Sequence, residues 1–184
     1  MHRDHLLALL SRYVPIDARD DEQRRRIESF VREQSSCFER SLACGHLTGS
    51  AWLLDAAGRR VLLTHHRKLN RWLQLGGHAD GDPDLLAVAL REAQEESGIA
   101  DIRAVSADIF DLDIHPIPQA RATPAHLHYD IRFLLQTCGS DAFVVSDESH
   151  ALGWFTPAEL ANLELDEAVR RMCTKWQRLR VRRS

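Results

Sequence analysis

A segment near the middle of the chain, residues 75–99, constrains the fold most strongly, because it concentrates negative charge where a helix is predicted to end. It reads LGGHADGDPDLLAVALREAQEESGI. Asp82 before Pro83 predicts the helix start, since the carboxylate can accept a free backbone N–H and proline needs no donor at the first helical position. Gly98 predicts the stop, because glycine readily closes a last turn. The segment therefore predicts one helix preceded by a glycine-rich loop.

The predicted helix carries an apolar stripe and an acidic face. The apolar stripe is formed by Leu86, Ala89, Leu90 and Ala93. Glu92, Glu95 and Glu96 fall within about a third of the helix circumference on another side. Their like charges repel and oppose the helix dipole, and an ion pair between Arg91 and Glu95 offsets only part of this cost. The acidic face therefore favours a counter-ion.

A divalent cation is one explanation for this acidic face. Clustered carboxylate oxygens favour hard ions such as Mg²⁺ or Mn²⁺, whereas zinc prefers histidine or cysteine ligands. The carbonyl groups of the glycine loop ahead of the helix are unshielded and can complete the coordination. The alternative is a solvated acidic face on a capped helix, which is common on protein surfaces.

The order and spacing of these residues resemble the signature of the Nudix hydrolases, in which a glycine and a fixed gap precede R-E-x-x-E-E-x-G and an aliphatic residue. The matching residues are Gly77, Arg91, Glu92, Glu95, Glu96, Gly98 and Ile99. Two positions depart from the family: Pro83 replaces a glutamate near the metal site, and Ala93 replaces a bulkier aliphatic residue. Asp82 and Asp84 flank Pro83 and could substitute for that glutamate. The resemblance extends over about residues 40 to 165.

The resemblance implies a Nudix-type pyrophosphohydrolase acting on acid anhydrides. Such an enzyme cleaves a diphosphate linkage in a nucleoside-diphosphate-type substrate by metal-dependent attack of water on phosphorus. The ligands that the resemblance implies for Mg²⁺ or Mn²⁺ are Glu92, Glu95, Glu96 and the carbonyl of Gly76. Arg91 would orient the carboxylates. The general base stays open between Glu92 and Glu148, which lies in the later loop SDESHA.

Three alternatives to this enzyme differ in class. A Nudix-fold module could bind a nucleotide-like ligand without cleaving it, although the three signature glutamates are all present. An isoprenoid diphosphate isomerase of the same fold would need a catalytic cysteine, and only Cys44 lies near the first predicted strand. The basic C-terminal segment RRMCTKWQRLRVRRS suggests RNA binding as a third alternative. An apolar stripe and favourable charge at a helix end explain the segment as well.

Alternating polar residues on two predicted strands form a further candidate site. In IFDLDIH, His115 shares one face with two aspartates, and in HLHYDIRF, His126 and His128 share a face with Asp130. The two polar faces can meet if the strands pair. We expect them either to contact substrate or a second metal, or to form an ordinary solvent-facing surface.

Two residues just before the glycine loop are candidates for substrate binding. Trp72 can stack on a nucleobase, with core packing as the alternative. Lys68 can contact phosphate, with a solvated surface charge as the alternative.

The chain as a whole is predicted to be an α+β protein with a Nudix-like α/β/α sandwich of mixed sheets, in which the helix of the signature packs against a sheet. Helices are predicted at residues 4–14, 21–34 and from about residue 165. Strands are predicted at 45–54, 61–66, 102–115 and 126–136, with shorter ones at FVVSD and ALGWF. Residues 1–40 would form an N-terminal helical extension, and residues 41–184 the Nudix domain including the C-terminal helix.

The composition of the chain limits its expected binding partners and its expected location in the cell. With 184 residues and 44% hydrophobic residues, the chain can bury one core, and a net charge of −3 gives no general attraction to nucleic acid or anionic membranes. The stretch LLALL is too short for a signal peptide, so a cytoplasmic protein with reduced cysteines is expected. The expected partner is a small nucleotide-like diphosphate, and the N-terminal helices could also support a homodimer.

Overall fold

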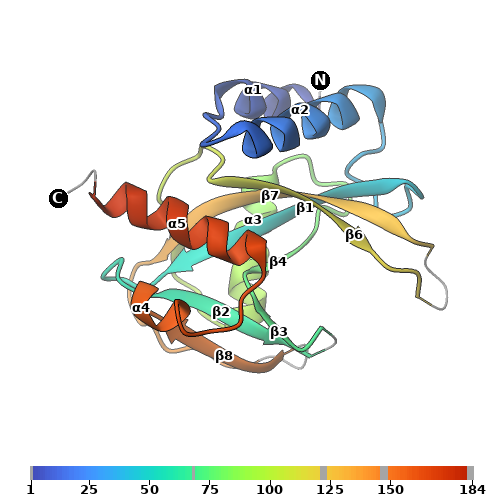
Figure 1. Ribbon diagram of the computed structural model, residues 1–184. Coiled ribbons are helices and arrows are strands. Elements are labelled where there is room, and N and C mark those ends of the chain that lie inside the picture. The colour runs from blue at the N-terminus through green and yellow to red at the C-terminus, as the bar shows by residue number, and fades with distance from the viewer. Residues whose placement is uncertain (1, 68, 121–123, 146–148, 182–184) are drawn as a thin grey trace. The chain divides into compact units, whose positions relative to one another are not determined.

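The computed structural model describes residues 2–67, 69–120, 124–145 and 149–181, in which two runs of strands are separated by helix α3 (Leu85–Ser97) and flanked by helices at either end (Figure 1). The elements are α1 (Asp4–Arg12), α2 (Ala18–Glu33), β1 (Gly45–Leu54), β2 (Val61–His66), β3 (Arg71–Leu73), β4 (Leu75–His78), α3 (Leu85–Ser97), β5 (Ile102–Ala104), β6 (Asp111–Ile117), β7 (His126–Thr137), β8 (Ser149–Phe155), α4 (Pro157–Leu160) and α5 (Glu167–Val181). Two compact units share these elements. Unit 1 comprises residues 1–50, 76–89 and 106–133, and unit 2 comprises residues 51–75, 90–105 and 134–184.

Strand pairing follows the order β3-β2-β1-β7-β5, with β4 paired to β1, β6 to β7 and β8 to β2. Strands β1 and β7 each begin in unit 1 and end in unit 2. All ten residues of β1 are buried, so this strand is covered on both faces. The predicted strands at 45–54 and 61–66 are present as β1 and β2, and they pair antiparallel with Leu53 opposite Leu62.

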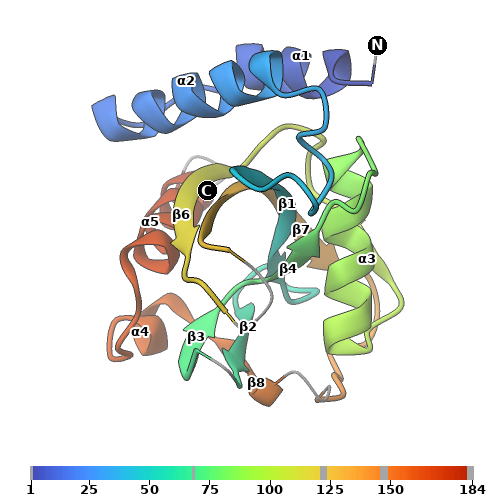
Figure 2. The same ribbon diagram turned by 90° about the vertical axis from the view of Figure 1, so that its right-hand side faces the viewer.

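In unit 1, α1 and α2 lie side by side (Figures 1 and 2). Their apolar faces are buried through residues such as Leu6, Leu10 and Ile27. The guanidinium of Arg3 donates hydrogen bonds to the carbonyls of Val31 and Arg32 at 2.8 and 2.9 Å, which ties the start of α1 to the end of α2.

Helix α2 packs on the strands of unit 1 through Phe30, whose ring stacks on that of Tyr129 in β7 at 3.8 Å between centroids. The helix begins at Ala18, three residues before the predicted start. The reason is the side chain of Asp17, which accepts a hydrogen bond from the backbone N–H of Asp20 at 2.8 Å and so caps the helix earlier.

Three strands of unit 1 present polar residues with a period of two, so that these side chains share one face of each strand. The residues are His46, Thr48 and Ser50 in β1, Asp111, Asp113 and His115 in β6, and His126, His128, Asp130 and Arg132 in β7. Antiparallel pairing of β6 with β7 places Asp113 opposite Asp130 and His115 opposite His128. The prediction that the two polar faces meet is therefore confirmed.

Arg132 is the centre of this polar face. Its side chain is 2% exposed and contacts three carboxylates, those of Asp130 at 2.7 Å, Asp111 at 3.0 Å and Asp113 at 3.4 Å. Thr48 and Ser50 of β1 donate to the carboxylate of Asp130 at 2.8 and 2.7 Å. Burial opposes the charged guanidinium, but the three carboxylates outweigh it and raise the pKa of Arg132 above its usual value.

Unit 2 combines β2, β3 and β8 with the last two helices (Figure 1). Strand β8 pairs with β2 over nearly its whole length, from Val61 opposite Phe155 to His66 opposite Ser149. Helix α5 buries Trp176, whose ring meets the edge of the fully buried Trp52 at 6.1 Å. These contacts form the core of unit 2.

Several predicted boundaries are wrong. The strand predicted at residues 102–115 is two strands, β5 and β6, with irregular chain between them. FVVSD is not a strand at residues 143–145, and its remaining two residues lie outside the described ranges. Helix α3 begins at Leu85 rather than at Pro83, and its buried apolar residues are Leu85, Val88, Ala89 and Ala93, while Leu86 and Leu90 are half-buried.

Among the helices within the described ranges, none combines the length and the apolar character needed to cross a membrane. The four cysteines, at positions 37, 44, 138 and 173, are free thiols.

Replacing Arg132 by methionine tests the polar face. The substitution leaves three buried carboxylates without their cation, so we expect the free energy of unfolding at pH 7 to fall by about 3–5 kcal/mol, measured by urea denaturation. The matched control is Arg103→Met, at an exposed position of β5, which should change stability by about 0.5 kcal/mol or less. Equal losses in the two variants would contradict the role given to Arg132.

Candidate metal-binding and catalytic residues

The two aspartates that flank Pro83 both accept backbone hydrogen bonds at the start of α3. The carboxylate of Asp84 accepts from the backbone N–H of Ala87 at 3.1 Å, and that of Asp82 accepts from the N–H of Asp84 at 2.9 Å. Asp84 therefore caps the first turn, and Asp82 closes the loop just before the helix. If these carboxylates also substituted for the glutamate that Pro83 replaces, as predicted, they would have to do so while accepting these backbone hydrogen bonds.

The acidic face lies on the second half of α3, in unit 2. Glu92 and Glu96 are half-buried and Glu95 is exposed. The guanidinium of Arg91 contacts the carboxylate of Glu92 at 3.4 Å, and the Glu92 side chain is 20% exposed. The helix places Glu92, Glu95 and Glu96 at i, i+3 and i+4, so their carboxylates project from one side. This arrangement offers several oxygen ligands together with a cation that orients one of them.

The end of α3 is fixed by backbone and side-chain bonds within unit 2. The hydroxyl of Ser97 donates to the carbonyl of Ala93 and accepts from the N–H of Ile99, and the N–H of Val144 donates to the carbonyl of Ser97 at 2.8 Å. Gly98 follows with a φ of +69°, so the predicted stop is confirmed. The three glutamates therefore stand on an anchored helix end.

Gly76, the predicted carbonyl ligand, lies in β4 of unit 1. A Cβ at this position would come within 2.3 Å of the Ser50 hydroxyl and 2.7 Å of the Ser50 Cα. Only glycine permits so close an approach of β4 to β1. The residue is thus required by packing, whatever its carbonyl binds.

The remaining predicted site residues fall into different places. Trp72 is half-buried in β3, where its ring contacts His65 at 5.1 Å and the edge of Phe155 at 4.9 Å. Lys68, predicted to contact phosphate, and Glu148, predicted as a general base, lie outside the described residues.

His115, His126 and His128 do come together, and with them two histidines that the sequence reasoning missed. His46 in β1 and His78 in β4 have rings 4.8 and 5.1 Å from that of His128. These five residues are named here the histidine cluster, and their strands can be followed in Figure 2. His46 and His78 lie far from the other three in the sequence, so no spacing motif could have revealed that they belong to this cluster.

Burial keeps the inner rings of the histidine cluster neutral. Desolvation, followed by the charges of neighbouring histidines, lowers the pKa of His46 to about 4 and that of His128 to about 2. Desolvation also lowers the pKa of His78, and the nearby Arg40, which is ion-paired with Asp80, acts in the same direction. Neutral imidazole is the form that binds metal ions.

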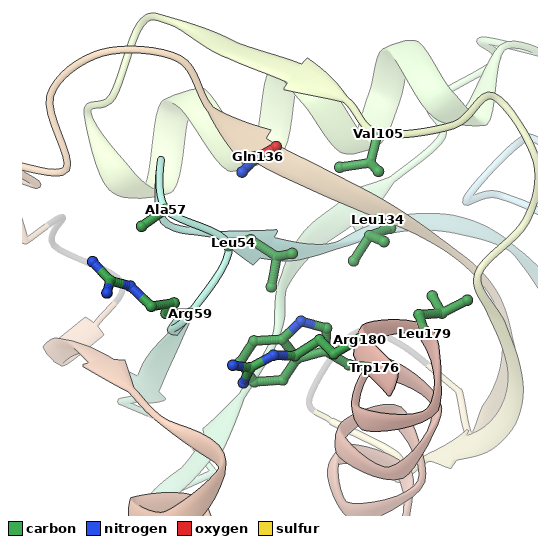
Figure 3. Close-up of a pocket in the computed structure, with 10 residues that line it drawn as sticks. Leu54, Ala57, Arg59, Val105, Leu134, Gln136, Trp176, Leu179 and Arg180 are labelled. Atoms are coloured by element: carbon green, nitrogen blue, oxygen red, sulfur yellow. The ribbon is translucent and has the colours of Figure 1, made fainter. Parts of the chain in front are cut away.

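A separate cavity of about 300 Å³ lies in unit 2 (Figure 3). Its lining residues are Leu54, Ala57, Gly58, Arg59, Val105, Leu134, Gln136, Trp176, Leu179 and Arg180. The guanidinium of Arg180 lies over the Trp176 ring at 5.4 Å. The cavity is lined by neither the glutamates of α3 nor the histidine cluster, so it is not the candidate site.

The fold and the acidic helix agree with a comparison against protein families. The model of the NUDIX domain family matches residues 46–177, which is more than half of the chain. The chain therefore belongs to the Nudix family, and the predictions of this family and of a Nudix-type enzyme are confirmed. A comparison with curated proteins finds no match.

Solved structures show the same fold. A hydrolase of the NUDIX family from Clostridium perfringens is 24% identical, with a TM-score of 0.54 over 73% of this chain and 97% of that chain. An Ap4A hydrolase from C. elegans is 16% identical, with a TM-score of 0.59 over 73% and 97%. The E. coli dihydroneopterin triphosphate pyrophosphohydrolase is 16% identical, with a TM-score of 0.53 over 69% and 91%. The predicted α+β Nudix-like architecture is therefore confirmed.

The lowered pKa values predict how the histidine cluster titrates. In the folded chain, with a chelator present, the ring resonances of His46 and His128 should keep their neutral positions from pH 8 to 5.5 in a nuclear magnetic resonance titration. In the urea-unfolded chain the same rings should titrate near the ordinary value of about 6.5.

The sign of the stability effect follows from this difference. Below about pH 6.5 the unfolded chain binds protons that the folded chain does not, so the free energy of unfolding should fall as the pH drops from 6.5 toward the folded pKa values. A titration midpoint between pH 6 and 7 for the ring of His46 or His128 in the folded chain would contradict the conclusion that burial keeps these rings neutral.

Proposed function

We propose that the chain is a metal-dependent hydrolase that cleaves a diphosphate linkage in a nucleoside-diphosphate-type substrate, with Mg²⁺ or Mn²⁺ as its ion. The observation that carries this proposal is the set of three carboxylates on one side of α3, next to Arg91 and inside the residues that match the family. The named activities of similar structures, on Ap4A and dihydroneopterin triphosphate, agree with substrates that contain phosphoanhydride bonds.

The donor set fits a hard divalent ion. Glu92, Glu95 and Glu96 offer only carboxylate oxygens, which suit Mg²⁺ or Mn²⁺ better than softer ions. The exposed side of Glu95 leaves room for an ion that keeps part of its water shell. When bound, the ion supplies positive charge that neutralises the non-bridging oxygens of the diphosphate. We also propose the carbonyl of Gly76 as a further ligand.

The residues of the chain would then divide the remaining work. Arg91 holds the carboxylate of Glu92 and is a positioning residue. Glu92 is half-buried, and either it or Glu148 would take the proton from the attacking water. Trp72 offers a half-buried aromatic ring for stacking on a base. Lys68, His115, His126 and His128 stay proposed as substrate contacts.

The proposal extends to the organisation of the chain. Residues 1–40 would act as a helical extension of a Nudix domain that spans residues 41–184. The partner would be a small nucleotide-like diphosphate rather than nucleic acid or a membrane, since the net charge of −3 gives no general attraction to either. A cytoplasmic location and a homodimer through the N-terminal helices belong to the same proposal.

Replacing Glu96 by glutamine tests the catalytic metal site. The change keeps the size of the side chain but removes an anionic ligand, so we expect phosphate or nucleotide release from a panel of nucleoside diphosphate derivatives in Mg²⁺ or Mn²⁺ to fall about 100-fold or more, because even outer partners of a metal site are worth 10- to 100-fold. The matched control is Glu164→Gln, at an exposed loop position, which should retain wild-type rates.

The outcomes separate the enzyme from a silent binding module. Turnover by the wild type that Glu96→Gln abolishes supports the proposal. Wild-type binding of a nucleotide in calorimetry without turnover of any member of the panel would favour the module. Turnover that both glutamine variants retain equally would overturn the role of the acidic face.

A further inference from the structure

The histidine cluster holds a group of ring nitrogens that is separate from the carboxylate ligands of the proposed hydrolase, although His128 is also a proposed substrate contact. One ring nitrogen each from His46, His78 and His128 lies within 4.8 Å of the other two. His46 comes from β1, His78 from β4 and His128 from β7, and all three residues belong to unit 1. The three ligands are thus supplied by paired strands rather than by loops.

The inner nitrogens of this group have no other use in the part of the chain that is described. His46 is 3% exposed, and neither of its ring nitrogens has a hydrogen-bond partner there. The Nε2 of His128 is buried and likewise has none. A buried polar atom without a partner costs free energy, so the unpartnered nitrogens of these two neighbouring rings indicate a ligand that bonds to one nitrogen of His46 and to the Nε2 of His128.

We propose that His46, His78 and His128 bind a divalent transition-metal ion, with Zn²⁺ as the best match. Three neutral imidazoles favour zinc over Mg²⁺, which prefers oxygen. Tetrahedral zinc with Zn–N bonds of about 2.0–2.1 Å places its ligand atoms about 3.4 Å apart. The observed limit of 4.8 Å therefore closes to bonding distance through small side-chain movements.

The surroundings of the three ligands suit such an ion. Three protein ligands leave the fourth tetrahedral position open. His126 lies beside the three ligands, with its ring 4.9 Å from that of His46 and 5.2 Å from that of His128. The Nδ1 of His126 lies 2.8 Å from the carbonyl of Pro124, and because a carbonyl only accepts, Nδ1 must carry the proton. The lone pair of a neutral His126 is then on Nε2.

His115 and Asp113 add an outer partner. The Nδ1 of His115 lies 3.2 Å from the carboxylate of Asp113, and the His115 ring meets that of His128 edge-on at 5.4 Å. Asp113 in turn contacts Arg132, so the ion site is continuous with the polar network of unit 1. The site shares no residue with Glu92, Glu95 and Glu96 and goes beyond the proposed hydrolase activity.

The experiment uses the full chain without a histidine tag, stripped with a chelator and dialysed. Zinc chloride is titrated into it by calorimetry in the presence of excess Mg²⁺, which occupies oxygen-rich sites. We expect one Zn²⁺ per wild-type chain and a loss of affinity of about 10-fold or more in His78→Gln. Two controls, His150→Gln at an exposed position of β8 and Glu96→Gln, should bind Zn²⁺ as the wild type does.

A second variant and a direct measurement cover the chance that His78→Gln disturbs folding. His128→Gln should show the same loss, and crystals of the wild type soaked in Zn²⁺ should give an anomalous peak between the three rings. Absence of that peak, equal affinity in wild type and both cluster variants, or loss of zinc binding in Glu96→Gln would overturn the proposal. The Mg²⁺-dependent hydrolase assay with Glu96→Gln is a different measurement from the zinc titration. A negative result for the zinc site therefore does not bear on the proposed hydrolase activity.

Discussion

The buried guanidinium of Arg132 is the interaction on which the polar face of unit 1 depends. Three carboxylates from β6 and β7 would repel one another without it, and the carboxylate of Asp130 also accepts hydrogen bonds from two hydroxyl groups of β1. These bonds join three strands at a defined register, since a shift by one residue would turn every one of these side chains to the other face. The same register places His115 opposite His128, so the charge network and the histidine cluster are held by one constraint.

The two proposed metal sites differ in the chemistry of their ligand atoms. The oxygen set stands on the second half of α3, where Glu92, Glu95 and Glu96 are half-buried or exposed and suit a hard ion. The nitrogen set stands in unit 1 around His46, which is buried and suits a borderline ion such as zinc. Under the two proposals the sets would bind different metals from the same solution, because ligand type selects the ion.

Local signals made the signature helix predictable, but the first residue of the helix and its buried stripe differ from the prediction. Gly98 ends α3 as predicted, since a left-handed glycine is a local requirement. The start moved from Pro83 to Leu85 because Asp84 rather than Asp82 caps the first turn. The buried stripe moved with it: Leu85 and Val88 are buried, and both contact β1, where a Cβ on Gly49 would meet them at 2.7–3.1 Å.

The sequence by itself determined the family, the acidic face and the alternation of polar residues along β6 and β7, because each is written in residues that are close together in the chain. Only the tertiary structure decided which polar faces join. His46, His78 and His128 are separated by 32 and 50 positions, and they meet because strand pairing brings β1, β4 and β7 together. Pairing between distant strands depends on the whole fold, so no local pattern contains it.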